Sequence, residues 1–348
     1  MLANFRKFPF RSKGAGIAFK DGQPYLITDP AAINTTGHHR RLIVAHFALF
    51  SAMAATFGPA IPDVEFLFGT ADQPTALLAS YSNGTDPNRL PLVLRFCRSA
   101  YSHADVLVPD IHFFIRNFTG KLLSAAATFN ATWPWEKKTN KLFGRFSPYP
   151  REVSKYAPEL YRRGFEGKDI CRDANPSMLF CDVRKHFMHE WARGARKVGL
   201  PVDVAQQPKR DMLYHASHKL LLHLDGQSCS SRLEQLLVLG SAVVKEESGG
   251  RGWAEARRAI RWAERHDSQA AAIGAAAQAV ALRYLHKRAL MCYWLRLLQE
   301  MAAIQRYKPG PEAGERNYTI WMPVSKFMQD EGMAELVLRK MTDMEFWD

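Results

Sequence analysis

A strand, a turn, a helix and a second strand are expected in direct succession between His218 and Lys245, and no other stretch constrains the fold as strongly. The stretch reads HKLLLHLDGQSCSSRLEQLLVLGSAVVK. Its apolar ends predict buried strands over 219–224 and 242–246, and the leucine-rich run between them predicts a helix over 231–239. Two buried strands joined through a helix are typical of a parallel sheet covered by helices. The stretch therefore predicts an α/β fold.

Apolar runs alternate with helical patterns along most of the remaining chain. A chain of 348 residues has room for two domains, and WPWEKKTN at 133–140 interrupts the alternation. We therefore expect a first domain over 1–140, a second domain over 141–308 and a tail over 309–348. The expected hairpin is 16–28, the other expected strands are 63–69, 90–98, 104–109 and 141–147, and the other expected helices are 39–57, 183–198, 252–265, 268–286, 288–305 and 333–341.

The turn between the strand and the helix carries residues suited to a phosphate group. Asp225 and Gly226 form the turn, and Ser230 and Ser231 lie at the expected start of the helix. Arg232 adds a cation with several donors, and free backbone N–H groups at a helix start favour a phosphate. The spacing of these residues fits two interpretations equally well: a phosphate-binding turn, or a capped helix that carries a surface arginine. Neither a GxGxxG nor a Walker A pattern is present, which argues against an ordinary dinucleotide enzyme or NTPase.

Several motifs in the same order resemble one known family. The stretch from His218 resembles the signature of the protein O-glucosyltransferases and the related capsule-associated xylosyltransferases of fungi, which form glycosyltransferase family 90. The resemblance covers residues 14–308. Its other motifs are GIAFKDGQPYLI, PDVEFLFGTADQP, FCRSAYSHADVLVPDIHFF, WPWEKKTNKLFGRFS and CYWLRLLQEMAAIQ.

The resemblance implies a fold, a reaction and a donor. The family has the GT-B fold, in which two Rossmann-like domains face a cleft. The implied reaction transfers glucose or xylose from a UDP-sugar to a hydroxyl of a protein or glycan, with inversion at the anomeric carbon. Such a transfer needs a base for the acceptor proton and positive charge for the leaving UDP. The implied partners are therefore the UDP-sugar donor and the acceptor.

The resemblance also assigns roles to residues. The aspartate of the family's D-x-P segment falls on Asp72, which is the candidate general base, although an aspartate before Pro is also common at a strand exit. Ser230 and Arg232 fall on the family's phosphate-binding S-x-R. Arg145 aligns with the arginine of F-R-G-S and is a further candidate for binding the donor, but here phenylalanine follows it and Gly144 precedes it. We expect no cofactor and no metal, because there is no D-x-D motif and no zinc-ligand spacing.

The resemblance is interrupted after Lys245 and resumes near Trp253. The family continues there with an aromatic helix and a P-W-x-H-Y-V-P strand, whereas this chain passes through 246–252 almost directly to Trp253. The second domain is therefore expected to lack one helix–strand unit, through a skipped exon or a faulty gene model, or because the enzyme is a diverged, shortened one. The alternative function is a non-catalytic pseudoenzyme that binds glycan or protein.

Charge, sequons and apolar runs indicate the compartment and partners. The net charge is +13, but the basic residues are dispersed and no nucleic-acid-binding motif is present, so no nucleic-acid partner is expected. The apolar run 42–57 contains His46 and predicts a buried helix. Five of the nine asparagines lie in N-x-S/T sequons, although Met1 begins no signal peptide. We expect the endoplasmic reticulum or Golgi lumen, with membrane association only through a missing N-terminal segment.

The five cysteines leave two alternatives open. Cys171 and Cys181 are close enough in sequence to pair across a short loop. The other alternative is five thiols with no bridge, because five cysteines in a chain of this length do not form a dense disulfide framework.

Overall fold

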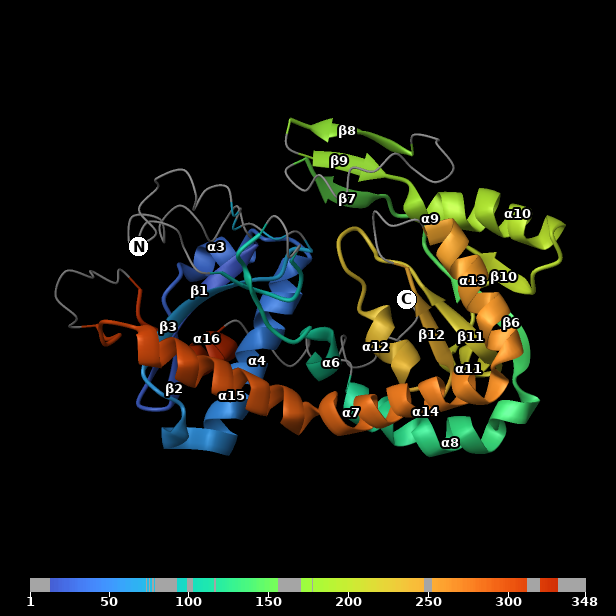
Figure 1. Ribbon diagram of the computed structural model, residues 1–348. Coiled ribbons are helices and arrows are strands. Elements are labelled where there is room, and N and C mark those ends of the chain that lie inside the picture. The colour runs from blue at the N-terminus through green and yellow to red at the C-terminus, as the bar shows by residue number, and fades with distance from the viewer. Residues whose placement is uncertain are drawn as a thin grey trace. The chain divides into compact units, whose positions relative to one another are not determined.

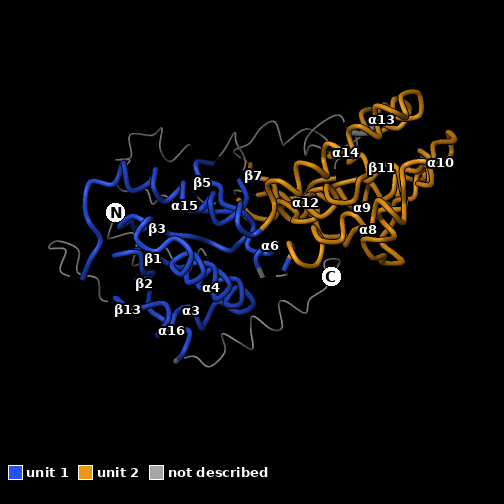
Figure 2. Tube along the Cα trace, turned by 90° about the horizontal axis from the view of Figure 1, so that it is seen from below, with its two compact units in different colours: residues 1–117, 287–344 blue, residues 118–286, 345–348 orange. Residues whose placement is uncertain are grey.

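The computed structural model divides the chain into two compact units, which Figure 2 colours separately. The structure describes residues 13–72, 74, 76, 78, 93–98, 103–115, 117–155, 170–176, 178–246, 252–311 and 320–330. Unit 1 comprises Met1–Asn117 and Lys287–Met344, and unit 2 comprises Phe118–His286 and Glu345–Asp348. The expected domain boundary at residue 140 thus lies inside unit 2, and the chain returns to unit 1 at Lys287.

Unit 1 is built on a mixed six-stranded sheet in the order β13-β2-β1-β3-β4-β5. β1 runs antiparallel to β2 and β3, whereas β3, β4 and β5 are parallel to one another. The strands are β1 (Gly14–Lys20), β2 (Gln23–Leu26), β3 (Val64–Gly69), β4 (Val93–Arg95), β5 (Val106–Leu107) and β13 (Met322–Pro323), and the main helices are α3 (Pro30–Asn34), α4 (His39–Phe57), α6 (His112–Ile115), α15 (Lys287–Ile304) and α16 (Val324–Asp330) (Figure 1).

The predicted hairpin is confirmed as β1 and β2. Its two loop residues, Asp21 and Gly22, have φ values of 49° and 73°, and Lys20 pairs with Gln23. Positive φ at both loop positions suits the twist of the strands, and Asp-Gly is a preferred sequence for such a turn. A Cβ atom on Gly22 would lie 2.5 Å from the carbonyl oxygen of Gly58, so glycine is required there for space as well.

Helix α4 lies in the core of unit 1. Among the described residues, His39–Ala60 is long and apolar enough to cross a membrane, but half of its most apolar window is buried inside the protein. Phe50 of α4 packs edge-to-face against Trp294 of α15, with 5.3 Å between ring centroids. Phe47 packs in the same way against Phe327 of α16, at 5.2 Å. Residues that the sequence assigned to a tail therefore add an edge strand and a core helix to unit 1.

Unit 2 contains a parallel sheet in the order β10-β6-β11-β12. In chain order these strands are second, first, third and fourth, so the connections turn to opposite sides between β6 and β11. Ligand crevices of doubly wound sheets lie at such a switch point, outside the carboxyl ends of the strands. The strands are β6 (Thr139–Arg145), β10 (Val202–Ala205), β11 (His218–His223) and β12 (Ala242–Lys245).

Both faces of this sheet are covered, as the apolar runs predicted. Leu220, Leu221 and Leu222 of β11 point to alternate faces and are all at most 2% exposed. The covering elements include α8 (Ala126–Thr132), α9 (Val183–His186), a π-helical turn (Phe187–Trp191), α10 (Ala192–Lys197), α11 (Met212–Ala216), α12 (Arg232–Leu237), α13 (Gly252–Arg265) and α14 (Asp267–Tyr284). Helices α8 and α14 lie side by side, joined by a 2.7 Å hydrogen bond from Asn130 to Gln278 (Figure 1).

Lys138 holds together the amino-terminal edge of the sheet. Its buried ammonium group donates to the carbonyl oxygens of Ala216 (2.7 Å) and Leu239 (2.9 Å) and to the hydroxyl of Ser241 (2.8 Å). Burial lowers the pKa of Lys138 to about 8. These bonds fix the segments that lead into β6, β11 and β12, so the opposite edge, where the strands end, is left for binding.

Unit 2 also carries a small antiparallel sheet in the order β7-β9-β8, which the sequence did not predict. Its strands are β7 (Arg151–Ser154), β8 (Cys171–Asn175) and β9 (Met178–Cys181). Cys171 and Cys181 lie opposite each other on neighbouring strands and form a disulfide, with 4.0 Å between their Cα atoms. Of the two alternatives for the cysteines, the Cys171–Cys181 bridge is thus confirmed.

Candidate functional site

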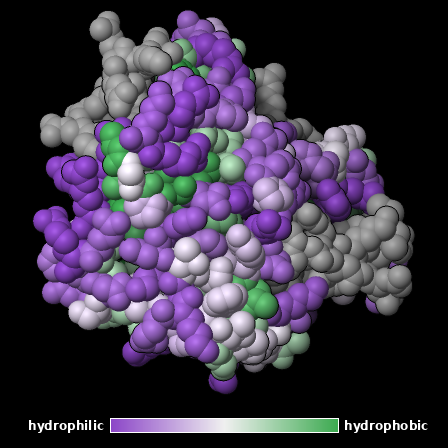
Figure 3. Space-filling view, turned by 90° about the vertical axis from the view of Figure 1, so that its right-hand side faces the viewer, coloured by the Kyte–Doolittle hydropathy of each residue, from purple (hydrophilic) through white to green (hydrophobic). Residues whose placement is uncertain are grey.

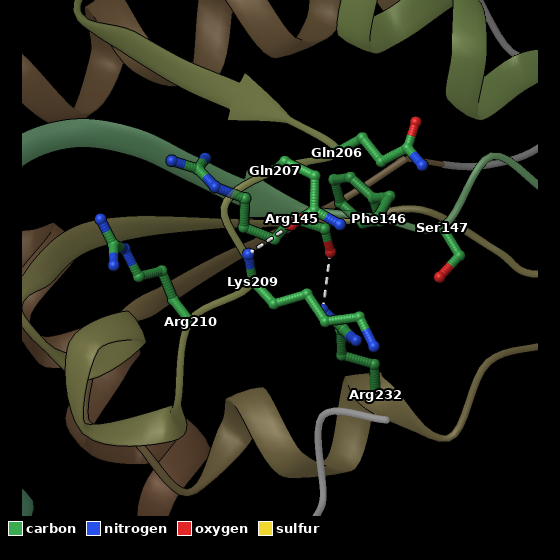
Figure 4. Close-up of a pocket in the computed structure, with 8 residues that line it drawn as sticks. All are labelled: Arg145, Phe146, Ser147, Gln206, Gln207, Lys209, Arg210 and Arg232. Carbon is green, nitrogen blue, oxygen red and sulfur yellow. Dashed lines mark hydrogen bonds between the residues drawn. The ribbon is translucent and has the colours of Figure 1, made fainter.

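A small basic pocket lies at the carboxyl edge of the parallel sheet of unit 2 (Figure 4). It is formed by residues that follow β6, residues that follow β10, and the first residue of α12, which places it at the switch point of the sheet. Its volume of about 90 Å³ suits phosphate groups and is too small for a whole nucleotide sugar. The lining residues are Arg145, Phe146, Ser147, Gln206, Gln207, Lys209, Arg210 and Arg232.

Arg145 lines this pocket but is bound mainly to the protein. It forms an ion pair with Asp203 at 2.8 Å, and its Nη1 also donates to the carbonyl oxygens of Gly144 and Asp203, both at 3.0 Å. Its Nε donates to the carbonyl oxygen of Pro208 at 3.1 Å, and its guanidinium lies 4.4 Å from the ring centroid of Phe143. Arg145, a candidate donor-binding residue from the family motif, here fixes the segment after β10, which carries the other side of the pocket.

Arg232 approaches the pocket from α12. Its Nη1 donates to the carbonyl oxygen of Arg145 at 2.6 Å, which holds the guanidinium at the pocket wall (Figure 4). Its backbone N–H donates to the hydroxyl of Ser230 at 3.4 Å, whereas the side chain of Ser231 makes no capping hydrogen bond. The structure therefore brings Arg145, Ser230 and Arg232 together beyond the ends of β6 and β11, and the N-cap residue of α12, Ser231, makes no side-chain cap.

Two arginines, of which Arg184 is buried, fix the turn at Asp225. Arg184 of α9 donates from Nε to the carbonyl oxygen of Asp225 at 2.9 Å and from Nη2 to that of Leu224 at 3.2 Å. Arg151 of β7 forms an ion pair with the Asp225 carboxylate. Burial lowers the pKa of Arg184 to about 10, and the nearby charge of Arg232 acts in the same direction. Sequence reasoning missed both arginines, since no motif links them to a turn 41 and 74 residues away.

His223 is a second residue that sequence reasoning missed. It is the last residue of β11, directly before the predicted site, and it is 1% exposed. Burial lowers its pKa to about 4, against a smaller opposing effect of Asp225. The imidazole is therefore neutral near pH 7, and the positive charge of this edge comes from the arginines and lysines.

Gly226 is expected to tolerate no side chain. A Cβ atom at this position would lie 2.5 Å from the carbonyl oxygen of Cys229, so the turn itself would have to move. We expect Gly226→Ala to lower the free energy of unfolding by about 1–3 kcal/mol, as overpacking does, and to disturb the start of α12. Denaturant unfolding checks this, with Gly310→Ala as control, because a Cβ on Gly310 meets nothing within 4 Å. Equal stability of the two variants would contradict it.

The carboxyl edge of the parallel strands in unit 1 carries a second group of polar residues. Asp72 follows β3, and Asp110 follows β5. The carboxylate of Asp110 accepts hydrogen bonds from the backbone N–H and the Nδ1 of His112, at 2.9 and 2.7 Å. Nδ1 of His39 lies 3.1 Å from the hydroxyl of Thr70, near the end of β3. Ends of parallel strands meet at one sheet edge, which is why these distant residues share a site.

Asp72 has the electrostatic surroundings of a base. Burial raises its pKa above the usual range, and the negative charge of Asp110 raises it further. His112, His38 and Lys13 act in the opposite direction. A carboxylate with a raised pKa accepts a proton more readily, which suits general-base catalysis near neutral pH. Asp72 belongs to unit 1, whereas Asp225, Gly226, Ser230, Ser231, Arg145 and Arg232 belong to unit 2.

Each unit thus carries an α/β sheet with polar residues at the ends of its parallel strands, which is the class of architecture that binds nucleotides and related ligands. Residues 250–335 match the family model of glycosyl transferase family 90. The match confirms the family that the sequence motifs predicted, and with it the glycosyltransferase class of enzyme. No curated protein matches the chain.

Proposed function

We propose that this glycosyltransferase uses a UDP-sugar, with glucose or xylose as the transferred sugar, and that its acceptor is a hydroxyl of a protein or glycan. The basic pocket at the switch point of the unit 2 sheet carries the proposal. A diphosphate matches this pocket in charge and in size, because Arg232, Lys209 and Arg210 line it and Arg145 orders its walls. The uracil, ribose and sugar would extend beyond it.

The proposed mechanism is a single in-line displacement with inversion. Asp72 takes the proton from the acceptor hydroxyl as its oxygen attacks the anomeric carbon. The bond between that carbon and the diphosphate oxygen breaks, and the positive charge of Arg232 stabilises the leaving UDP. The proposal includes a GT-B arrangement, in which Asp72 and the diphosphate site belong to separate Rossmann-like domains. It is supported by the division of these residues between two units, each with parallel strands.

We further propose that the protein works in the lumen of the secretory pathway. Asn34 and Asn117, two of the sequon asparagines, lie exposed on the surface, as glycosylated asparagines do. The Cys171–Cys181 disulfide fits an oxidising compartment. Asn130 is also exposed, but its side chain is hydrogen-bonded to Gln278, which disfavours its modification. The sequons at Asn83 and Asn317 lie outside the described residues.

Titration calorimetry with UDP tests the donor site. Replacing Arg232 with methionine removes a charged donor from the pocket but keeps a side chain of similar length. We expect UDP binding to weaken about tenfold to a hundredfold, the cost of losing a hydrogen bond to a charged group. Arg296→Met is the matched control, because Arg296 is exposed in unit 1 and pairs with Glu300. If the unaltered protein gives no heat with UDP, the donor assignment is wrong and the pseudoenzyme alternative is favoured.

A further inference from the structure

A groove runs along the outer edge of β12 in unit 2, away from the basic pocket. It has a volume of about 320 Å³ and is lined mainly by apolar residues. One wall is formed by the five consecutive residues 242–246, and the other by α13 and the start of α14, including Ala259, Trp262 and Ile273. Hydrophobic residues gather in a hollow beside a hydrophilic ridge on this side of the molecule (Figure 3).

The groove runs along the edge of the strand and also reaches the sheet face that carries Leu220 of β11. Side chains of consecutive strand residues point to opposite faces, so a cavity over one face would be lined by every second residue. Here all of 242–246 line it. In the described part of the chain, β12 is the last strand of its sheet and pairs only with β11. The backbone of β12 is therefore the floor of the groove.

The hydrogen-bond pattern shows which backbone groups face the groove. The N–H of Glu246 donates to the carbonyl oxygen of His223 on β11 at 3.1 Å. Alternate residues of a strand direct their backbone groups to opposite sides. Val244 therefore also faces β11, whereas the backbone groups of Val243 and Lys245 point outward, along the edge that a further strand would use.

Charged residues of both signs surround the groove, and three exposed basic residues lie beside it. Lys245 is exposed at one end, and α13 carries Arg258 and Arg265, both exposed, on the side of the helix next to Trp262. Glu255 and Glu246 also line the groove, and Glu255 lies 3.8 Å from the guanidinium of Arg258. The whole chain carries a net charge of +13, so the protein attracts acidic partners and disfavours a second copy of itself.

We propose that this groove binds an extended segment of a partner protein, which adds a strand to β12, places alternate apolar side chains in the groove and carries acidic residues at its ends. Main-chain hydrogen bonds supply affinity in such strand addition, and the side-chain pockets supply specificity. A membrane surface fits less well, because a flat bilayer cannot reach the backbone at the floor of a hollow. The proposal is independent of the sugar-transfer function.

Binding of a synthetic probe peptide to the full chain, measured by fluorescence anisotropy, tests the proposal. In the probe, valine and threonine alternate between terminal aspartates, and a matched control peptide has lysines at both ends. Val243→Pro removes an N–H group that points away from β11, so no hydrogen bond to that strand is lost. Proline is tolerated at such positions on the edge of a sheet. We expect about tenfold weaker binding for the lysine-ended peptide, for Val243→Pro and for Arg258→Glu, with unchanged thermal unfolding.

Hydrogen exchange supplies a readout that does not depend on the variants. Bound probe should slow exchange at the amides of Val243 and Lys245 and leave the amide of Val244, already facing β11, nearly unchanged. Absent binding at millimolar probe, or equal binding of the two peptides, would overturn the proposal. So would a dimer that Val243→Pro abolishes, because the occupant would then be a second copy of the chain.

Discussion

Replacing Asp72 with asparagine is expected to abolish sugar transfer while UDP binding is retained. Asparagine keeps the shape of the side chain but accepts no proton, so the acceptor hydroxyl loses its base. A drop in kcat of about a thousandfold is the usual size of a general-base contribution. Steady-state transfer assays and UDP calorimetry on the same preparation check both parts. Retained turnover would remove Asp72 as the base.

The same variant has a predicted effect on stability that separates lost chemistry from lost structure. The pKa of Asp72 is raised in the folded protein, so the fold favours its protonated form. The stabilising contribution of this group is therefore present at acid pH and is lost as pH rises through the folded pKa. At neutral pH, asparagine relieves the buried charge, and Tm should rise. Asp21→Asn, at an exposed turn position where asparagine tolerates positive φ, should change neither activity nor Tm.

Mild acid is expected to unfold the protein. Burial lowers the pKa of His39, His46, His215 and His223 to about 4 each, from an ordinary value near 6.5. Below pH 6.5 the histidines of the unfolded chain bind protons, whereas the buried rings of the folded protein do not. The contribution of these rings to the free energy of unfolding is therefore fully present above pH 6.5 and decreases as the pH falls toward 4. A fully buried ring such as that of His46 contributes a loss of up to about 3 kcal/mol by pH 4. Each unit contains two of the four histidines, and such losses are a large part of the stability of a domain.

Unfolding free energy measured between pH 7 and pH 4 checks this expectation, and one substitution isolates a single ring. His46 lies 4.5 Å from Phe68 between ring centroids, and its Nδ1 is 2.8 Å from the carbonyl oxygen of Leu42. His46→Gln should reduce the slope of stability against pH by up to about one proton, whatever its effect at pH 7. The exposed His189, replaced in the same way, should leave the slope unchanged. Stability that is constant down to pH 4 would contradict the prediction.

Patterns between sequence neighbours identified the elements that carry the candidate site. The apolar run before Asp225 forms β11, the leucine-rich run forms α12, and Asp21-Gly22 forms the hairpin turn. These patterns are informative because burial on both faces of a parallel sheet requires continuous apolar runs, and a tight turn requires particular backbone angles. The ordered motifs also identified the family, which the match over 250–335 confirms.

Contacts between segments that are far apart in the sequence decide which groups each charged side chain binds. Arg145, Arg151 and Arg184 look alike as sequence positions, but the first orders the segment after β10 and the other two fix the turn at Asp225. Likewise, β13 at Met322–Pro323 completes the unit 1 sheet beside β2, although the sequence assigned it to a tail. Local patterns fixed which segments form the parallel strands, because burial and turn geometry act on neighbouring residues. Only the tertiary structure decided which arginines remain for a phosphate, because a guanidinium is used by whichever carbonyl and carboxylate oxygens the fold brings within reach.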